Sequence, residues 1–353
     1  RRPLIVVGDE VVKSDALVEV AQFAETLGCP VFQQSVAFGA HFLSENLCYM
    51  GALSRDQKQV RQLLSTFDLM IVLGADPLRM SVYSDVEPLP EGMPIVQIGL
   101  VDGDLAKNYS VELAVKADVR EALRALTPAV AAAGGPDLVR RASESMSKLR
   151  SSNWSARRKV LVEEISAKKE CSPIDPDWLT LQMLQAMPSD AILVDEGLTS
   201  ARYVPALRAH RDRYGYHGLA SGGIGWGLPA SVGVSLASPT RPVVCYSGDG
   251  SAMYSIQALW TAAHHKLPLT VVIANNGGYR IIKQRLLAFH KDKQFVGMDF
   301  ADPPVDFVGL ATALGAEAIR VTRGQDLAAA LKSAMLRPGT KLVDVQVDGS
   351  VNS

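Results

Sequence analysis

The sequence predicts an α/β protein with two doubly wound parallel-sheet domains, and three observations support this prediction. Short apolar, β-branched segments that suit buried strands alternate with segments whose apolar residues recur at helical spacing. The alternation occurs twice, once on each side of a charged stretch near the middle of the chain. The length of 353 residues also exceeds what one hydrophobic core ordinarily organises, so we expect two domains.

The first domain is predicted over residues 1–130. Its expected strands are residues 4–7, 30–32, 69–74, 95–99 and 112–115, and its expected helices are residues 16–27 and 119–126. Strands that alternate with helices in this way indicate a parallel sheet covered by helices. A single glycine, Gly8, follows the first strand, where a dinucleotide site would carry Gly-x-Gly-x-x-Gly. We therefore predict no nucleotide in this domain and interpret it as a structural spacer.

Residues 131–175 are predicted to form a linker with a solvated helix, because small residues are followed there by a charged stretch. Pro173 and Pro176 bracket the entry to the second domain, predicted over residues 176–353. A helix near Trp178 is expected to open this domain. Its expected strands are residues 192–194, 242–246, 269–274 and 341–345.

Composition excludes several classes of function. The 36 Lys and Arg residues balance 37 Asp and Glu residues, so no charge excess points to nucleic acid or to an anionic membrane surface. No apolar run has the roughly 20 residues that a membrane-spanning helix needs. The four cysteines lack the spacing of metal or redox sites, so we expect reduced thiols in a cytoplasmic protein.

The most informative pattern lies between residues 248 and 276. The strand at 242–246 leads to a Gly-Asp-Gly turn centred on Asp249, and the strand at 269–274 ends at two asparagines, Asn275 and Asn276. Asn276 follows Asp249 by 27 residues, the length of one strand–helix–strand unit. The right-handed crossover of such a unit places both strand ends on one edge of the sheet. Oxygen ligands beside the N–H groups of a helix start suit a Mg²⁺ ion that holds a diphosphate.

A helix is expected between these two strands. Gly250 and Ser251 would open it, where unpaired N–H groups and the positive end of the helix dipole favour phosphate. Its apolar residues at helical spacing are Ile256, Leu259, Trp260 and Ala263. Simpler alternatives exist, since Asp249 could serve only in a tight turn and Ser251 only as a helix cap.

The run from Gly248-Asp249-Gly250-Ser251 to Asn275-Asn276 resembles the signature of thiamine-diphosphate-dependent enzymes. The glycine-rich segment 221–230 is similar to that of the decarboxylase/acetolactate-synthase superfamily, and residues 248–263 most resemble benzoylformate decarboxylases. The resemblance covers nearly the whole chain, weakly in the first third and strongly from about residue 190 to residue 279. It implies the middle domain and the diphosphate-binding domain of such an enzyme.

Thiamine diphosphate and Mg²⁺ are the cofactors that the resemblance implies. Asp249, the side-chain oxygen of Asn276 and the backbone carbonyl of Gly278 would bind the Mg²⁺. The diphosphate and water would complete the near-octahedral shell of the ion, while Asn275 would stabilise the turn. The other contacts implied for the diphosphate and the cofactor are Thr199, Ser200, Gly250, Ser251 and Tyr279.

Two residues of the glycine-rich segment receive catalytic roles from the resemblance. Gly222 would offer its backbone carbonyl to the 4′-amino group of the cofactor. Ile224 would be the apolar wedge that bends the cofactor, so that its amino group approaches the thiazolium carbon and takes the proton within one molecule. An ordinary core isoleucine in a glycine-rich turn is the alternative.

The substrate pocket is expected to involve Ile281 and Ile282. Ile282 lies where pyruvate-decarboxylase-like relatives carry a glutamate, and an apolar wall suits an aromatic or branched substrate. A helix face packed on the core is the alternative for both residues. Asn46 stands where benzoylformate decarboxylases carry a histidine, and an amide cannot replace that histidine in proton transfer.

The resemblance implies decarboxylation of a 2-oxo acid to an aldehyde. The alternatives are a carboligase or lyase of the acetolactate-synthase or hydroxyacyl-CoA-lyase type, and a non-catalytic cofactor-binding fragment. Relatives carry a pyrimidine-binding domain before the point where this chain begins, so we expect the chain alone to be inactive and to need that domain in cis or in trans. The other expected partners are a small 2-oxo acid and further copies of the chain, as a homodimer or homotetramer, with no nucleic acid and no membrane.

Overall fold

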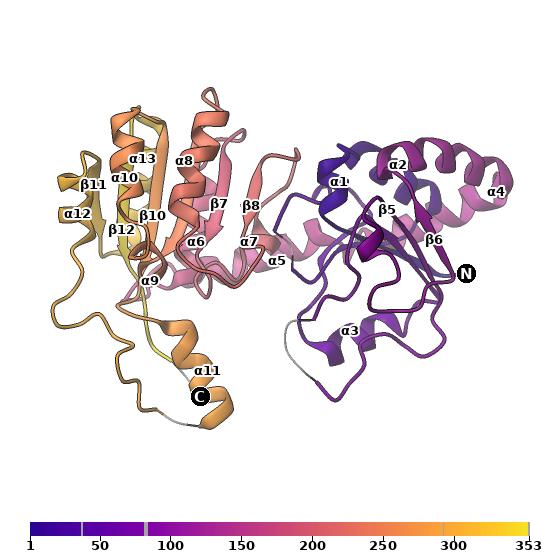
Figure 1. Ribbon diagram of the computed structural model, residues 1–353, viewed down its shortest axis with the longest axis horizontal. Helices are drawn as coiled ribbons and strands as arrows, with labels where there is room; N and C mark the ends of the chain where they lie inside the picture. The colour runs from indigo at the N-terminus through magenta and orange to yellow at the C-terminus, as the bar shows by residue number, and fades with distance from the viewer. Residues whose placement is uncertain (37, 81–83, 292, 352–353) are drawn as a thin grey trace. The chain divides into compact units, whose positions relative to one another are not determined.

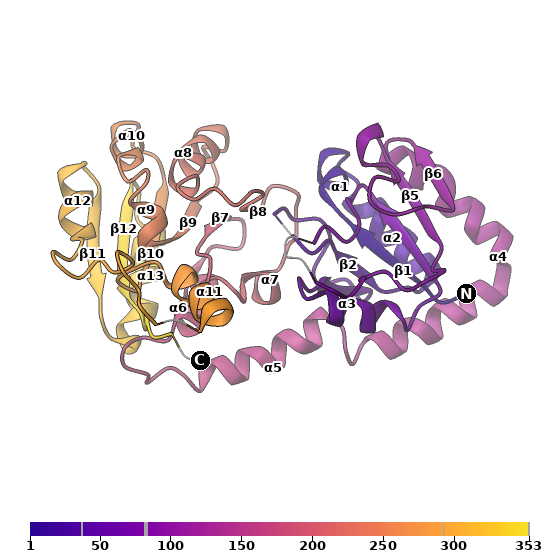
Figure 2. The same ribbon diagram turned by 60° about the horizontal axis from the view of Figure 1, so that its bottom comes forward.

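The computed structural model describes residues 1–36, 38–80, 84–291 and 293–351. The chain divides into two compact units. Unit 1 comprises Arg1–Val160 with Ala209–Tyr214, and unit 2 comprises Leu161–Arg208 with Gly215–Ser353. Each unit contains one six-stranded parallel sheet with helices packed on it (Figures 1 and 2), which confirms the predicted fold class.

The sheet of unit 1 has the strand order β3-β2-β1-β4-β5-β6. Its strands are β1 (Pro3–Val7), β2 (Val31–Gln33), β3 (Tyr49–Ala52), β4 (Leu69–Leu73), β5 (Ile95–Gly99) and β6 (Leu113–Lys116). Five of these match expected strands. β3 was not predicted, because its four residues include a glycine and form no continuous apolar run.

Alternate residues of the strands of unit 1 face two separate cores. Ile5 and Val7 pack with one helical layer, whereas Leu4 and Val6 pack with the other, as the period of two in a strand requires. The helices are α1 (Asp9–Lys13), α2 (Leu17–Leu27), α3 (Gln57–Leu64), the 3₁₀ helix η1 (Asp102–Asp104) and α4 (Val119–Leu149). Residues of α1, α2 and α4 join the first core, and residues of α3 join the second.

The segment predicted as a linker is largely helical. Helix α4 continues beyond the expected end at Leu126 to Leu149, with a break at Gly135, whose φ is +53°. Proline is tolerated at a helix start, so Pro136 can follow directly and the chain resumes a helix. Helix α5 (Trp154–Ser166) completes this segment.

Unit 1 also takes up a segment from much later in the chain, residues 209–214. Two hydrogen bonds join Ser44 to His210: the Ser44 N–H donates to the His210 carbonyl at 3.0 Å, and the His210 N–H donates to Ser44 Oγ at 2.9 Å. Arg211 adds a bidentate ion pair with Glu45, at 3.0 Å for both contacts.

The sheet of unit 2 has the strand order β11-β12-β10-β9-β7-β8. Its strands are β7 (Ile192–Glu196), β8 (Tyr216–Gly218), β9 (Val243–Gly248), β10 (Leu269–Asn275), β11 (Glu317–Val321) and β12 (Lys341–Gln346). The four central strands were predicted. The two edge strands, β8 and β11, were missed because short or charged segments with few apolar residues carry little strand signal.

Helices cover both faces of this second sheet (Figure 1). They are α6 (Pro176–Ala186), α7 (Val204–Leu207), α8 (Gly227–Ala237), α9 (Asp249–Ala252), α10 (Ala258–His264), α11 (Arg280–His290), α12 (Phe307–Ala313), the 3₁₀ helix η2 (Gly324–Asp326) and α13 (Leu327–Leu336). Helices α8, α10 and α12 share one core with β9 and β10, and α6 packs against α13. In the part of the chain that the structure describes, no helix is both long and apolar enough to cross a membrane.

Candidate functional site

Three neighbouring strands of unit 2 end at the same edge of the sheet. β7 and β9 are parallel with Glu196 opposite Ser247, and β9 and β10 are parallel with Gly248 opposite Ala274. The strand order reverses between β7 and β9, since β8 lies on one side of this pair and β10 on the other. Open α/β sheets bind ligands at such a reversal, beyond the carboxyl ends of the strands.

Asp249 lies at this edge, directly after β9, with only 1% of its surface exposed. Its Oδ1 accepts a hydrogen bond from the Gly250 N–H at 2.9 Å, and its Oδ2 accepts one from the Gly278 N–H at 3.0 Å. Burial raises the pKa of Asp249 from 3.8 to about 6, although these backbone donors act in the opposite direction. The carboxylate is therefore costly to ionise unless a cation accompanies it.

The two asparagines after β10 differ in their contacts. Asn275 is fully engaged, since its Nδ2 donates to Asp344 at 3.0 Å and its Oδ1 accepts from the Gly277 N–H at 3.3 Å. This confirms that Asn275 stabilises the turn. Asn276 Oδ1 is buried and has no hydrogen-bond partner among the described residues. A buried carboxamide oxygen without a partner is rare in proteins, and a bound ligand is one way to satisfy it.

These residues fit a Mg²⁺ ion that is held together with a diphosphate. Asp249 offers a carboxylate, Asn276 offers its unpartnered oxygen, and the Gly278 N–H bond to Asp249 brings the Gly278 peptide to the same carboxylate. The Gly278 carbonyl accepts from the Arg280 N–H at 3.0 Å and keeps a second lone pair. The described residues contain no cluster of three His, Cys, Asp or Glu side chains that could hold a metal alone. Mg²⁺ commonly takes one or two protein ligands beside phosphate and water.

The chain after Asp249 departs from the single helix expected there. Helix α9 ends after four residues, a turn follows, and α10 begins at Ala258. This change of direction alters which side chains face the core. Leu259 and Ala262 are buried, whereas Trp260, one of the apolar residues at helical spacing, is 55% exposed and stacks on His264 with ring centroids 5.0 Å apart.

Gly250 lies beneath the ring of Tyr279. A Cβ atom at Gly250 would lie 2.7 Å from Tyr279 Cε1, and the Tyr279 ring is in turn packed edge-on against Phe300 at 4.9 Å. Burial and a hydrogen bond with Tyr254 raise the pKa of Tyr279. The sequence pattern explained Gly250 by a tight turn, and the structure adds this close approach of an aromatic ring. Ser251, the other expected phosphate contact in α9, is buried.

Replacing Gly250 by Ala is expected to destabilise unit 2 by about 1–3 kcal/mol, because the new methyl group must displace the Tyr279 ring from its contact with Phe300. Urea unfolding followed by tryptophan fluorescence measures this change. Gly248→Ala is the matched control, because a Cβ atom there meets nothing within 4 Å. Equal stability of the two variants would contradict the tight packing of Gly250.

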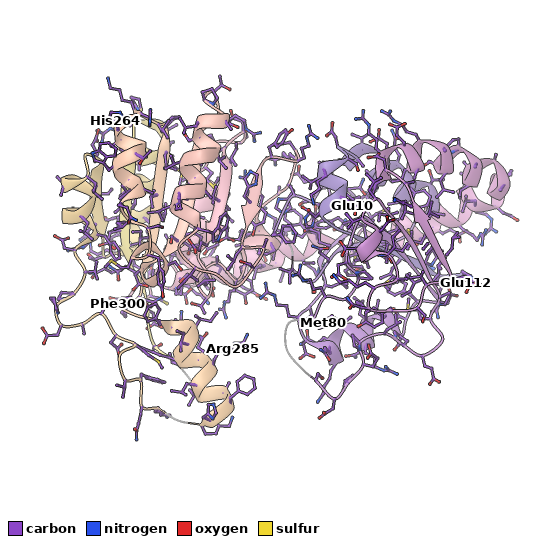
Figure 3. The ribbon with its side chains drawn as sticks, in the orientation of Figure 1. Glu10, Met80, Glu112, His264, Arg285 and Phe300 are labelled. Carbon is purple, nitrogen blue, oxygen red and sulfur yellow. The ribbon has the colours of Figure 1, made fainter. Side chains whose placement is uncertain are left out.

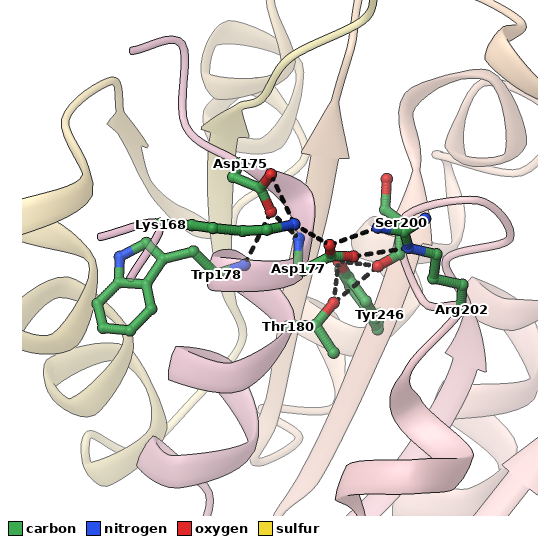
Figure 4. A network of polar contacts seen from close by, with 8 residues as sticks. All are labelled: Lys168, Asp175, Asp177, Trp178, Thr180, Ser200, Arg202 and Tyr246. Atoms are coloured by element: carbon green, nitrogen blue, oxygen red, sulfur yellow. Dashed lines mark hydrogen bonds and ion pairs between the residues drawn. The ribbon is translucent and has the colours of Figure 1, made fainter. Parts of the chain in front are cut away.

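The turn after β7 carries Thr199 and Ser200, and a buried network holds it (Figure 4). Thr180 Oγ1 donates to the Ser200 carbonyl at 2.7 Å, and the Tyr246 hydroxyl donates to the same oxygen at 3.4 Å. Ser200 Oγ is buried and has no partner among the described residues, whereas Thr199 is partly exposed. The turn thus carries two hydroxyls, and the hydrogen bonds from Thr180 and Tyr246 fix its backbone at Ser200.

An ion cluster continues this network (Figure 4). The buried carboxylate of Asp177 accepts from Arg202 Nε at 2.9 Å and Nη2 at 2.5 Å, and from Lys168 Nζ at 2.5 Å. Burial alone would raise the pKa of Asp177, but the hydrogen bonds from Arg202 and Lys168 outweigh it and lower that pKa. Arg202 follows Ser200 by two residues, so the cluster anchors the far end of the turn.

A second buried carboxylate, Glu196, holds the glycine-rich segment, and it was not among the predicted site residues. Its two oxygens accept hydrogen bonds from the N–H groups of Gly225, Trp226 and Gly227. Of the expected catalytic residues, Gly222 is exposed and Ile224 is half-buried. Only the adjacent pair of acidic residues at a strand end, Asp195 and Glu196, could have signalled this role.

The expected substrate residues lie on α11. Ile281 is half-buried and Ile282 is 45% exposed, so Ile282 does not belong to a packed core face. Arg285 lies on the same helix, and Phe300 lies near its start (Figure 3). A separate cavity of about 370 Å³ opens beside Asn275 and Asn276. Its other lining residues include Phe300, Asp306, Phe307 and Arg320. The role of Ile281 and Ile282 stays a prediction.

Comparison with known protein families agrees with this fold and site. Residues 1–126 match the central domain of thiamine pyrophosphate enzymes, and residues 197–345 match their C-terminal TPP binding domain. Asp249, Asn276, Gly278 and the turn with Thr199 and Ser200 lie within the second match. Both matched domains are domains of thiamine pyrophosphate enzymes. The chain belongs to the thiamine pyrophosphate enzyme family.

Relatives in that family carry several activities. Benzoylformate decarboxylase of Pseudomonas aeruginosa is 28% identical over 345 residues, which cover 98% of this chain and 61% of that protein. Acetolactate synthase isozyme 1 large subunit of Escherichia coli is 27% identical over 358 residues, which cover 99% of this chain and 59% of that protein. A putative acetolactate synthase large subunit of Mycobacterium tuberculosis is 41% identical over 170 residues, 47% of this chain and 33% of that protein.

Solved structures show the same architecture. A thiamine-diphosphate-dependent 4-hydroxybenzoylformate decarboxylase of Rhodococcus jostii superposes with a TM-score of 0.81 at 27% identity, covering 98% of this chain and 61% of that one. A putative thiamin diphosphate-dependent enzyme of Mycobacterium smegmatis superposes with a TM-score of 0.77 at 27% identity, covering 99% and 62%. The chain therefore spans about 60% of the length of the relatives that it matches end to end.

Proposed function

We propose that this chain carries the diphosphate-binding half of a thiamine-diphosphate- and Mg²⁺-dependent lyase that decarboxylates a 2-oxo acid to an aldehyde. One observation carries the proposal. A buried carboxylate, Asp249, and a buried carboxamide oxygen without a partner, Asn276 Oδ1, follow neighbouring strands of a TPP-binding domain. A cation between them, with its anionic ligand, would neutralise the buried carboxylate and give the carboxamide oxygen a partner.

Asp249, Asn276 and the Gly278 carbonyl would hold the Mg²⁺, and the N–H groups that open α9 would face the diphosphate, at Gly250 and Ser251. Thr199 and Ser200 would donate their hydroxyls from the turn after β7. When bound, thiamine diphosphate supplies a carbon nucleophile for the keto group and an electron sink for the electrons that CO₂ leaves behind. The protein orients this chemistry and excludes water from it.

Gly222 and Ile224 would act on the other half of the cofactor. The Gly222 carbonyl would accept a hydrogen bond from the 4′-amino group, and the Ile224 side chain would support the bend between the two rings. The exposure of Gly222 and the half-burial of Ile224 support these roles, because neither residue is committed to the hydrophobic core of unit 2. Tyr279, which covers Gly250, would close the cofactor site from the side of α11.

A benzoylformate-like substrate suits the apolar residues Ile281 and Ile282 at the start of α11. A carboligase or lyase is the second candidate, because the relative that is 41% identical over 170 residues is a putative acetolactate synthase large subunit. Asn46, a residue of unit 1, bears on the choice between a benzoylformate-like decarboxylase and a carboligase or lyase. Its Nδ2 donates to Glu25 at 2.7 Å and its Oδ1 accepts from the Cys48 N–H at 2.9 Å, so it stabilises a turn and is no acid or base.

Catalysis would also need a group at the pyrimidine ring of the cofactor. We propose that a pyrimidine-binding domain outside this chain supplies it, in cis or in trans, within a homodimer or homotetramer. The greater length of the relatives supports this. A non-catalytic cofactor-binding fragment is the remaining alternative, and failure of any pyrimidine-binding domain to restore turnover would favour it.

Isothermal titration of the chain with thiamine diphosphate tests the proposal. We expect weak binding in the presence of Mg²⁺, loss of that binding on addition of EDTA, and tighter binding when a pyrimidine-binding domain is supplied. With a pyrimidine-binding domain supplied, incubation with a panel of 2-oxo acids should release CO₂, and product analysis separates an aldehyde from a ligation product. Absence of any Mg²⁺-dependent binding would refute the proposal.

A further inference from the structure

Glu196 and Asp249 are both almost completely buried at the edge of the sheet that carries the site. Among the described residues, no Lys or Arg side chain forms an ion pair with Glu196. Glu196 ends β7 and is 1% exposed. Its Oε1 accepts from the N–H groups of Gly225 at 2.5 Å and Trp226 at 3.3 Å, and its Oε2 accepts from Gly227 at 2.7 Å. Burial raises the pKa of Glu196, and these three donors oppose that rise.

The residues that Glu196 holds form the stem of a loop. We define the glycine loop as residues 222–227, with 225–227 as its stem and 222–224 as its tip. Gly227 must lack a side chain, because a Cβ atom there would lie 2.7 Å from Glu196 Oε2. Gly225 has a φ of +93°, and a Cβ atom there would lie 2.4 Å from Tyr254 Cβ. Both glycines therefore serve the close approach of the stem to its neighbours.

The stem is also held from its other side. Ser255 Oγ donates to the Gly225 carbonyl at 2.7 Å. The backbone N–H and the backbone carbonyl of Gly225 are therefore both hydrogen-bonded. The tip is different. Gly222 is exposed, with nothing within 4 Å of where its Cβ atom would be, and Ile224 is half-buried. A fixed stem thus carries an open tip.

We propose that Glu196 is a positioning residue that fixes the stem of the glycine loop, so that the tip meets the pyrimidine end of thiamine diphosphate in a preset conformation. This role rests on the proposed function of the site. Glu196 itself contacts the stem of the loop through three backbone N–H groups. A loop that is already ordered loses less conformational entropy on binding, so its contacts contribute more to affinity and orientation.

The hold of Glu196 on the stem of the glycine loop can be tested without any cofactor. Glu196→Gln keeps the length of the side chain but replaces one acceptor oxygen by a donor, which faces an N–H group of the stem. Amide hydrogen exchange of residues 220–227 in the unliganded chain is expected to accelerate roughly tenfold or more, as for loss of a hydrogen bond to a charged group. Unchanged exchange would overturn the proposal.

Glu10→Gln is the matched control for this measurement. Glu10 is a buried carboxylate of unit 1 (Figure 3) that likewise accepts backbone hydrogen bonds, from the N–H groups of Leu100 at 2.6 Å and Val101 at 3.3 Å. It belongs to unit 1 and its carboxylate holds the backbone of residues 100 and 101, so exchange of residues 220–227 in unit 2 should stay at the wild-type rate. Equal acceleration in both variants would show a general effect and would overturn the assignment to Glu196.

A second readout separates positioning from a merely structural role. Mg²⁺-pyrophosphate lacks the pyrimidine, so Glu196→Gln should bind it within about twofold of wild type, while the affinity for Mg²⁺-thiamine diphosphate falls about tenfold or more. Equal losses for both ligands would refute the positioning role alone. Failure of the wild-type chain to bind either ligand would refute the proposed function and this role with it.

Gly227→Ala keeps the test decisive if Glu196→Gln does not fold. The added methyl group pushes the Glu196 carboxylate away from the Gly227 N–H while residue 196 remains a glutamate, and alanine favours the helix that begins there. We expect the same acceleration of exchange and the same selective loss of thiamine diphosphate affinity. Wild-type behaviour of this variant in both measurements would overturn the proposal.

Discussion

Replacing Asp249 by Asn is expected to weaken Mg²⁺-dependent binding of thiamine diphosphate more than about 100-fold and, at pH 7.5, to stabilise the unliganded protein by roughly 1 kcal/mol. The opposite signs share one cause. Raising the pKa of Asp249 from 3.8 to about 6 corresponds to roughly 3 kcal/mol of penalty on the charged form. An asparagine removes that penalty but loses one of two backbone hydrogen bonds, which costs about 1–2 kcal/mol.

The pH dependence of this effect has a defined sign. Between about pH 4 and pH 6 the native state binds more protons at Asp249 than the unfolded state does, so the stability of the wild type falls as pH rises through this window. The advantage of Asp249→Asn should therefore be full at pH 7.5 and absent at pH 4. Urea unfolding at both values, without Mg²⁺, measures it. An advantage that grows toward pH 4 would contradict the assignment.

Asp195→Asn is the matched control for Asp249→Asn. Asp195 lies at the end of β7, burial raises its pKa to about 6 as well, and it accepts hydrogen bonds from the Gly197 N–H at 3.0 Å and the Tyr216 hydroxyl at 3.1 Å. We expect a similar gain in stability and no change in Mg²⁺ affinity. Equal loss of cofactor binding in both variants would show that Asp249 has no special place at the metal.

Replacing Arg202 by Met is expected to lower the free energy of unfolding by about 2 kcal/mol at pH 7, because the buried Asp177 then keeps only its ion pair with Lys168. The value lies below that of a fully buried pair, since the side chain of Arg202 is itself more than half exposed. The same substitution loosens the turn that carries Thr199 and Ser200. Diphosphate affinity should therefore fall together with stability.

Acid removes this difference between Arg202→Met and wild type. The pKa of Asp177 is lowered in the folded state, so its ion cluster contributes fully above the ordinary value of 3.8 and loses its contribution as pH falls below it. The two proteins should converge in stability below about pH 3, as measured by urea unfolding across pH. Arg323→Met is the control, because Arg323 pairs with Asp326 at the surface and should cost less than about 0.5 kcal/mol. A difference that persists in acid would contradict the charge-based account.

The central parts of this fold follow from local patterns that any reader of the sequence can recognise. β1, β4, β9 and β10 are continuous apolar runs, and the Asp249–Asn276 spacing follows from the length of one crossover. The edge strands escape such analysis because partners decide whether short, mixed segments form strands. The outward position of Trp260 follows from the early end of α9, which no residue type announces.

The contacts that hold the site in place are a different matter, because they join distant segments. Glu196 meets residues about 30 positions later, and Asp177 meets Arg202 across 25 positions. The residues next to a carboxylate do not show whether it binds the backbone of a distant loop or faces water. Their pairing emerges only when the strands of unit 2 bring β7, α6 and the glycine loop together, so it could not be predicted from motifs.

Unit 1 can be completed only after the late segment 209–214 has been synthesised. As the chain leaves the ribosome, residues 1–160 appear well before the six residues that complete unit 1, and about fifty residues of the other unit emerge in between. Until then Ser44 and Glu45 lack the partners that His210 and Arg211 later provide. A chain truncated after residue 160 would thus lack the segment that contacts Ser44 and Glu45. We expect such a chain to be more sensitive to proteases near Ser44 than the full chain.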